Sequence, residues 1–203
     1  MPNPVKISAT IITLNEEAKI EACLKSLAGV VDEIVVVDSC SRDRTEEICR
    51  KFGVRFISHP FEGYVAQKNF AVSQASYDHI LALDADERIS DELRQSILEV
   101  KSDWGPVSGY ACNRYNNYCG KWIRNCGWYP DRKIRLWDRR KAKWGGEDPH
   151  DKVILPGREL KRLKGDLLHF AYYTVDEHLL QMHKFGEIAA KAKFKNGIRP
   201  FFV

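Results

Sequence analysis

Two aspartates with one residue between them, Asp84 and Asp86, directly follow the apolar run HILAL. If the backbone bends after this predicted strand, both carboxylates can converge on one hard divalent cation. Such a cation could bridge the oxygens of a diphosphate and stabilise it as a leaving group. A solvated acidic turn is the alternative explanation. The position of the pair at the end of a core strand favours the metal site.

Two other polar residues also stand where a predicted strand ends. Thr13 ends a run rich in β-branched residues, and Asp38 ends the apolar run EIVVVD. Ligands of α/β sheets lie at the carboxyl ends of the strands. We therefore expect Thr13, Asp38 and Asp84 to meet at one edge of a sheet. Local roles are also open, for Asp38 in a turn and for Asn15 as a helix cap.

The first hundred residues alternate strand and helix patterns, as such a site requires. The predicted strands are 5–13, 33–38, 54–58 and 79–83. A predicted helix follows each strand. The first is capped by Asn15, the second by Ser41 or Asp43 and the fourth by Ser90, and the third, at 64–75, has no predicted cap. This order predicts an α/β fold with a mostly parallel, Rossmann-like sheet and helices on both faces.

After Gly105 the alternation stops. Short strand patterns at 109–115, 133–138 and 152–155 are separated by turn-rich, aromatic segments. A capping box at 174–177 precedes a last helix that ends near residue 193. Because these pieces are too thin for a core of their own, we expect a smaller β-rich lobe and a C-terminal helix fused to the sheet.

Composition excludes several classes of protein. The chain has 203 residues, of which 44% are hydrophobic and 30% charged, the balance of a folded domain. It has no apolar run long enough to span a membrane and no secretory signal, and its six cysteines form no CxxC pair. We expect a cytoplasmic protein with reduced thiols.

Charge divides the chain into two unlike halves. Residues 1–100 carry 11 Lys or Arg and 17 Asp or Glu, whereas residues 101–203 carry 21 and 11. All five tryptophans also lie in the second half. The acidic half suits a metal cation, and the basic, aromatic half suits an anionic or amphiphilic partner.

Four segments together resemble the family 2 glycosyltransferases, which have the GT-A fold. They are TIITLNEE at 10–17, EIVVVDSCSRDRT at 33–45, GYVAQKNFA at 63–71 and LALDADERIS at 81–90. The chain is most similar to the small bacterial enzymes that add sugars to the lipopolysaccharide core, in which the QKNFA-type helix and YPDRKIRLW recur. The resemblance implies one glycosyltransferase domain at 1–203. Its nucleotide-sugar-binding half would be 1–105 and its acceptor and catalytic-base half 106–203, with a C-terminus that could be shortened.

The resemblance also implies site roles. Asp86 would be the main ligand of Mg²⁺ or Mn²⁺, Asp84 would contact ribose or metal, and His169 could complete the metal shell, although a packed histidine is the alternative. Arg132 and Arg135 could pair with phosphate, or simply charge the surface of a strand. The residues expected at the nucleotide-sugar site are Thr13, Asn15, Glu16, Asp38, Gln67, Lys68, Asn69, Asp84, Arg132 and Arg135.

An inverting transferase also needs a carboxylate base for the acceptor hydroxyl. The segment WGGEDPHDKV at 144–153 holds three carboxylates within five residues. The family commonly has a His–Glu pair here, and His150-Asp151 matches it with Asp in place of Glu. Asp151 is therefore the first candidate, and Glu147 and Asp148 are the others. An acidic loop that offsets nearby basic residues is the alternative explanation.

These observations predict an inverting glycosyltransferase with a UDP-sugar donor, glucose being the expected sugar. The acceptor would be a lipopolysaccharide-core or other lipid-linked saccharide, with peripheral contact at the cytoplasmic face of the inner membrane. The segment 191–203, which alternates basic and apolar residues, could begin a membrane-surface element. A sugar-nucleotidyltransferase is an alternative, but no glycine-rich phosphate loop follows the first strand. A nucleic-acid-binding protein is another, and the acidic sheet edge argues against that partner.

Overall fold

The computed structural model describes residues 4–157, 159–195 and 197. The first half contains β1 (Ile7–Thr13), α1 (Ile20–Leu27), β2 (Glu33–Asp38), α2 (Thr45–Lys51), β3 (Arg55–Ser58), α3 (Tyr64–Gln74), β4 (His79–Asp84), β5 (Glu87–Ile89) and α4 (Asp91–Ser102). The second half contains β6 (Gly109–Tyr118), β7 (Lys121–Ile123), β8 (Asp131–Asp138), β9 (Lys143–Glu147), β10 (His150–Ile154), β11 (Leu160–Tyr172) and α5 (Val175–Lys195). Within these residues, no helix has both the length and the apolar character needed to cross a bilayer.

One nine-stranded sheet joins both halves, in the order β3-β2-β1-β4-β8-β6-β11-β5, with β7 paired to β6. Strands β3, β2, β1 and β4 are parallel to one another, and β8 is antiparallel to β4. Strands β9 and β10 form a separate hairpin. The predicted α/β class is confirmed, and the four strands of its first-half sheet are parallel as expected, whereas the whole sheet is mixed because β8, β7 and β5 pair in the antiparallel sense.

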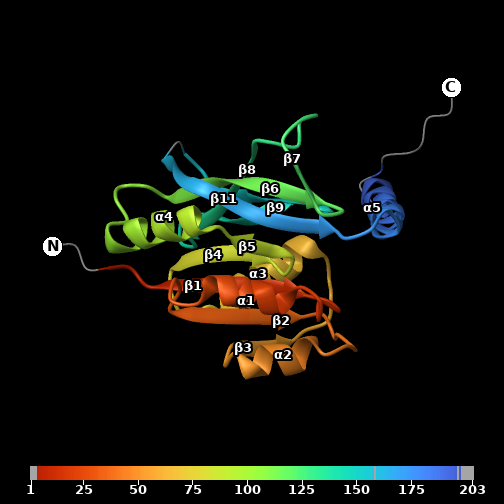
Figure 1. Ribbon diagram of the computed structural model, residues 1–203, viewed down its shortest axis with the longest axis horizontal. Coiled ribbons are helices and arrows are strands. Elements are labelled where there is room, and N and C mark those ends of the chain that lie inside the picture. Colours follow the sequence, from red (N-terminus) through yellow and green to blue (C-terminus); the bar gives the residue numbers. More distant parts are fainter. Residues whose placement is uncertain (1–3, 158, 196, 198–203) are drawn as a thin grey trace.

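The sheet curls back on itself. Strand β5 follows β4 after only two residues, yet β5 pairs with β11 at the far end of the strand order. Both pairings can hold only if β8, β6 and β11 bend round so that β11 returns to the side of β4. Figure 1 shows β5 next to β4, with β6 and β11 lying over them. The inside of this curl is where the candidate site lies.

Two apolar layers cover the faces of the sheet. The larger core packs α1 and α4 against one face, with Leu24 and Ile97 fully buried against Ile11. The opposite face is covered by α3 and the β9–β10 hairpin, where Trp137 and Trp144 meet edge to face. Because side chains alternate between faces along a strand, β1 and β4 contribute side chains to both apolar layers.

One of the predicted helix starts is wrong. Helix α1 begins at Ile20 instead of directly after Asn15, because Asn15 has a φ of 55° and joins a loop. The backbone N–H of Asn15 donates to Ser41 Oγ (2.7 Å), and Asn15 Oδ1 accepts from Arg42 N–H (2.9 Å). Helix α2 begins at Thr45, and of its two predicted caps Asp43 is the one that bonds to its start, since Asp43 Oδ1 accepts from Thr45 N–H (3.0 Å). Ser90 likewise caps α4 as predicted, since its Oγ accepts from Leu93 N–H (3.2 Å).

The second half contains more strand than its sequence suggested. Strand β6 has 10 residues and β11 has 13, and both belong to the main sheet instead of to a thin lobe. Strands β7 and β9 were not expected, nor was β5 in the first half. Their short or charged sequences give little local signal, so pairing with neighbours decides their structure. The predicted helix near the C-terminus is confirmed as α5, whereas residues 198–203 lie outside the described residues.

Candidate active site

The three strand-end residues meet at one edge of the sheet, as the sequence predicted. Thr13 of β1 is in register with Asp38 of β2, and Ile12, one residue earlier, is in register with Asp84 of β4. Thr13 Oγ1 donates to Asp38 Oδ1 at 2.8 Å, and both side chains are buried. The backbone N–H of Ser41 donates to the other Asp38 oxygen at 2.7 Å. Asp38 therefore organises the loop after β2.

Asp84 is held by two cations. Its Oδ1 lies 2.9 Å from Lys68 Nζ, and its Oδ2 lies 2.9 Å from an Arg135 guanidinium nitrogen. Burial would raise the pKa of Asp84, but the charges of Lys68 and Arg135 hold it well below its ordinary value. Both Asp84 oxygens are thus engaged within the protein.

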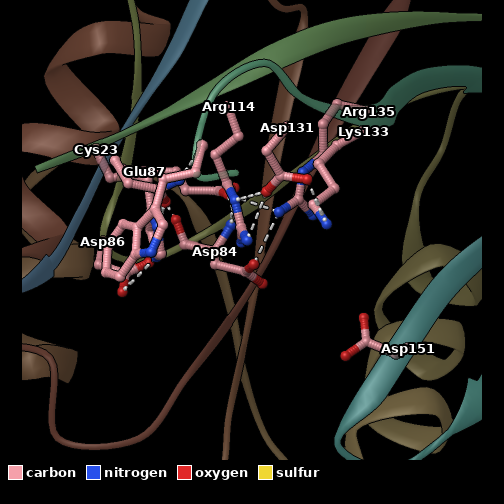
Figure 2. A network of polar contacts seen from close by, with 12 residues as sticks. Cys23, Asp84, Asp86, Glu87, Arg114, Asp131, Lys133, Arg135 and Asp151 are labelled. Atoms are coloured by element: carbon pink, nitrogen blue, oxygen red, sulfur yellow. Dashed lines mark hydrogen bonds and ion pairs between the residues drawn. The ribbon is translucent and has the colours of Figure 1, made fainter. Parts of the chain in front are cut away.

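Glu87 is a buried carboxylate that the sequence analysis missed. It is fully buried on β5, where it accepts from Arg135 at 2.6 Å and from the Asp84 backbone N–H at 2.9 Å. Arg114 of β6 lies 4.0 Å away. Burial raises the pKa of Glu87, and Asp84 adds to that rise against the opposing charge of Arg135. Figure 2 shows Asp84 and Glu87 among the side chains of Arg114 and Arg135.

Asp86 faces a histidine from the far end of the sheet. Its Oδ2 lies 3.3 Å from His169 Nε2, and the other ring nitrogen of His169 is 2.6 Å from Asn116 Oδ1. Burial would raise the pKa of Asp86, but His169 beside it keeps the pKa low. The curl of the sheet brings the two residues together, because β11 pairs with β5 directly after Asp86.

Glu16 lies above the same edge. Burial, together with the negative charges of Asp86, Asp43 and Asp84, raises the pKa of Glu16 from 4.5 to about 7. The backbone N–H of Glu16 donates to Thr45 Oγ1 at 2.8 Å, which fixes its loop against α2. A carboxyl group whose pKa is near neutral pH thus lies beside the aspartates.

The three candidate bases occupy different places on the β9–β10 hairpin. Asp151 is mostly buried, and its Oδ2 lies 2.8 Å from Lys68 Nζ, so one amine joins Asp151 to Asp84. Asp148 instead accepts the backbone N–H groups of Tyr64 (3.0 Å) and Val65 (3.1 Å) at the start of α3. Glu147 is exposed. Figure 2 shows Asp151 on β10, to one side of the charged cluster.

Several residues expected at the nucleotide-sugar site instead bond to the protein itself. Gln67 is fully buried, and its amide donates to Ser39 Oγ and the His59 carbonyl. Asn69 makes two reciprocal hydrogen bonds to the backbone of Trp144, which attach β9 to α3. Arg135 is buried between carboxylates and not on a strand surface, whereas Arg132 is exposed.

The sequence model described as "Glycosyl transferase family 2" matches residues 8–155, more than half of the chain. This chain is a family 2 glycosyltransferase. The matched residues contain all the strand ends of the site and its β9–β10 hairpin.

Two relatives align along nearly the whole chain. The lipopolysaccharide core biosynthesis glycosyltransferase LpsC of Rhizobium meliloti is 32% identical over 97% of this chain and 74% of that protein. An uncharacterized glycosyltransferase of Rickettsia typhi, RT0209, is 46% identical over 95% of this chain and 69% of that protein. This glycosyltransferase therefore spans about three quarters of LpsC.

Two solved glycosyltransferase structures are similar to this one over smaller parts. Glucosyl-3-phosphoglycerate synthase of Mycobacterium tuberculosis, in complex with Mn²⁺ and UDP, has a TM-score of 0.46 and is 24% identical, over 56% of this chain and 44% of that chain. Staphylococcus aureus TarS, in complex with UDP, has a TM-score of 0.47 and is 27% identical, over 59% and 38%.

A divalent cation fits this glycosyltransferase at Asp86 and His169. Among the described residues, no group of three His, Cys, Asp or Glu side chains is placed to hold a metal by itself. The carboxylate and the imidazole do point at each other, however, and oxygen with nitrogen is a donor pair that Mn²⁺ accepts. Mg²⁺ and Mn²⁺ are often held by one or two protein groups and completed by substrate phosphates. Asp84 fits less well, because Lys68 and Arg135 already occupy it.

Proposed function

We propose that this glycosyltransferase moves a sugar, with glucose the expected one, from a UDP-sugar to a lipopolysaccharide-core or other lipid-linked saccharide. The relative LpsC, named for lipopolysaccharide core biosynthesis, supports this acceptor class. The observation that carries the proposal is the approach of Asp86 to His169 at the carboxyl edge of the sheet, beside the Thr13–Asp38 pair. That edge is where α/β sheets bind nucleotides.

In this proposal each part of the site has a separate task. Thr13 and Asp38 hold the nucleoside, and Asp86 with His169 holds a cation. That cation would neutralise charge on the departing diphosphate. Asp151 takes the proton of the acceptor hydroxyl. The hydroxyl oxygen of the acceptor bonds to the anomeric carbon as the bond from that carbon to UDP breaks, which inverts the carbon. Lys68 joins the proposed base to the donor side of the site.

Transfer from a panel of UDP-sugars to core oligosaccharide, with and without Mn²⁺, tests the proposal. Asp86→Ala should abolish transfer and metal-dependent UDP binding. Asp91→Ala removes an exposed carboxylate at the start of α4 and should leave both intact. Full activity in Asp86→Ala would show that the proposed site is wrong.

The same assay separates the three candidate bases. Asp151→Asn should lower kcat by about a hundredfold or more, the usual scale of general-base catalysis, with little change in donor KM. Glu147→Gln and Asp148→Asn should lower it much less. If Glu147→Gln has the largest effect instead, the base lies at the end of β9.

We also propose that the acceptor is reached at the cytoplasmic face of a membrane, by peripheral contact. Helix α5 stands at the edge of the body (Figure 1) and exposes Leu179, Leu180 and Met182. Lysines such as Lys184 lie on the same helix, and cations with apolar side chains favour an anionic lipid surface. Sedimentation with anionic vesicles should decrease when Leu179 and Leu180 are replaced by serine.

A further inference from the structure

A cavity lies between β6, β11 and the start of α4, away from the ion pairs of Asp84, Glu87 and Arg135. Its volume is about 400 Å³, and its polar lining includes Glu92, Asn113, Tyr129, Arg162, Lys164 and Asp166. None of these residues belongs to the donor or base side of the proposed active site. The cavity is therefore a feature that the proposed transfer reaction does not use.

The register of the sheet explains why the cavity is there. Strands β6 and β11 are paired from Leu160 to Arg162 and again from Asp166, with a shift between. This irregularity lets β11 depart from β6 and leaves space beside Asn113. Asn113 precedes Arg114, whose side chain approaches Glu87 inside the curl. Because neighbours on a strand point to opposite faces, Asn113 points to the other face of β6.

A buried asparagine holds the polar lining of the cavity in place. Asn113 is only 2% exposed, and its amide nitrogen donates to Tyr129 Oη at 3.1 Å and to Asp166 Oδ1 at 3.4 Å. Tyr129 Oη in turn donates to Asp166 Oδ1 at 3.0 Å. Asn113 Oδ1 has no hydrogen-bond partner. Because Asn113 Oδ1 is closed to solvent, a ligand in the cavity would meet this group at Tyr129 Oη and Asp166, which the Asn113 amide nitrogen holds in place.

The cavity has a cationic edge, and Tyr129 in its lining packs on aromatic rings that lie outside the lining. Arg162 and Lys164 are exposed at the cavity. Tyr129 packs against Tyr115 with ring centroids 5.1 Å apart, and Tyr115 packs against Trp122 at 4.8 Å. Trp122 is 37% exposed. Aromatic rings with an apolar body and polar edges suit ligands that are apolar on one side and hydrogen-bonding on the other.

We propose that this cavity is a second binding site, for an anionic saccharide. Asp166 and Glu92 accept from sugar hydroxyls beside Tyr129, and Arg162 pairs with a phosphate or carboxylate on the sugar. The identification of this saccharide as a remote part of the acceptor rests on the proposed function. Binding itself does not require that function.

The test is a titration of the full chain, labelled with ¹⁵N, without UDP-sugar or metal. The probe is phosphorylated core oligosaccharide released from lipopolysaccharide by mild acid. We expect the side-chain amide signals of Asn113 to shift during the titration. Arg162→Ala should weaken binding about tenfold, the effect of losing one charge-assisted hydrogen bond. Lys161→Ala, which removes an exposed charge from the neighbouring residue outside the cavity, should leave the dissociation constant unchanged.

Further titrations show which part of the oligosaccharide the cavity binds. Dephosphorylated oligosaccharide should bind more weakly, and inorganic phosphate weaker still. Tyr129→Phe, which keeps the ring, should also weaken binding of the oligosaccharide. Absence of binding, equal binding of phosphate alone, or equal effects of Arg162→Ala and Lys161→Ala would each overturn the proposal. Asp86→Asn should bind the probe normally, so a failure of the transfer reaction and a failure of this site can be told apart.

Discussion

At the scale of single residues, the site is a set of buried charges that satisfy one another. Asp84 and Glu87 share Arg135, and Lys68 joins Asp84 to Asp151. A charge taken out of water is costly unless it is paired and hydrogen-bonded. The pairing therefore matters less as a source of stability than as a condition for keeping these groups buried in one geometry.

Removal of one member of this network should be costly. Glu87→Ala leaves the buried Arg135 with only one carboxylate partner, and we expect the free energy of unfolding to fall by about 3 kcal/mol. Urea denaturation measures this loss. Glu21→Ala, which breaks an exposed ion pair with Lys25 on α1, should leave the midpoint almost unchanged. Equal losses in the two variants would contradict a stabilising role for the network.

The raised pKa of Glu16 should make stability depend on pH. In the folded chain Glu16 keeps its proton up to about pH 7, whereas its ordinary pKa is 4.5. Between these values the folded state binds more protons than the unfolded state, so the free energy of unfolding falls as pH rises and levels off above pH 7. Glu16→Gln should reduce this fall by on the order of 1 to 2 kcal/mol.

The measurement is denaturation at pH 5 and pH 8 in chelator, which removes bound cations. Glu47→Gln is the control, because Lys51 holds the pKa of Glu47 below its ordinary value. That variant should not reduce the fall in stability between the two pH values. An unchanged profile in Glu16→Gln would show that another group causes it.

At the scale of elements, the β9–β10 hairpin and α3 position each other. Asp148, more than eighty positions further along the chain, accepts the first backbone N–H groups of α3. Asn69 on α3 in turn bonds to the backbone of Trp144 on β9. Trp144 also lies 4.5 Å from Lys68 Nζ, with its ring beneath the amine. These contacts fix Asp151 relative to Lys68, so the hairpin places the proposed base.

Gly63 is the residue on which this arrangement depends most closely. Its φ is 122°, and a Cβ added there would overlap Asp148 Oδ2. Gly63→Ala should therefore lower the free energy of unfolding by more than about 2 kcal/mol, which is roughly twice the backbone strain of an ordinary residue in the left-handed region. Gly29→Ala is the comparison with a milder backbone and no overlap, because its φ is 75° and a Cβ there meets nothing within 4 Å, whereas Gly63 has the glycine-only combination of φ 122° and ψ 158°. Thermal unfolding of both variants compares them, and a larger loss for Gly29→Ala would contradict the overlap.

At the scale of the whole molecule, the two halves share one sheet and one core. Strand β4 pairs with β8, and the main core unites Leu24 and Leu83 with Leu136 and Leu167. Neither half buries its apolar residues alone. The division into a nucleotide-sugar half and an acceptor half can therefore describe tasks, but it does not describe separately folded units.

Truncation tests this sharing. Residues 1–105 alone should fail to unfold cooperatively, because the β4 edge and the α4 face lose their partners. Residues 1–174, which lack only α5 and the tail, should keep cooperative unfolding, since α5 exposes Leu179 and Leu180 by 58% and 73%. Circular dichroism during heating distinguishes the two outcomes. A sharp transition in residues 1–105 would contradict a shared core.

The sequence alone predicted the features that depend on near neighbours. Strand and helix periodicity placed β1, β2, β4, α3 and α4 within a few residues, and the Ser90 cap was predicted correctly. The alternation also predicted that Thr13, Asp38 and Asp84 share one edge, because parallel strands end together. Such patterns are local, and each is repeated along the chain.

Only the tertiary structure decided which distant residues complete the site. Glu87 and Arg114, which the sequence analysis did not name, join Arg135 and His169 because the sheet curls, and that curl depends on strand pairs between residues up to about eighty positions apart. Asp148 became a helix cap and Asn15 a loop residue for the same reason, since contacts with distant segments override local preference. Local sequence specifies what each element is, whereas burial and charge pairing across the curled sheet specify which side chains face one another.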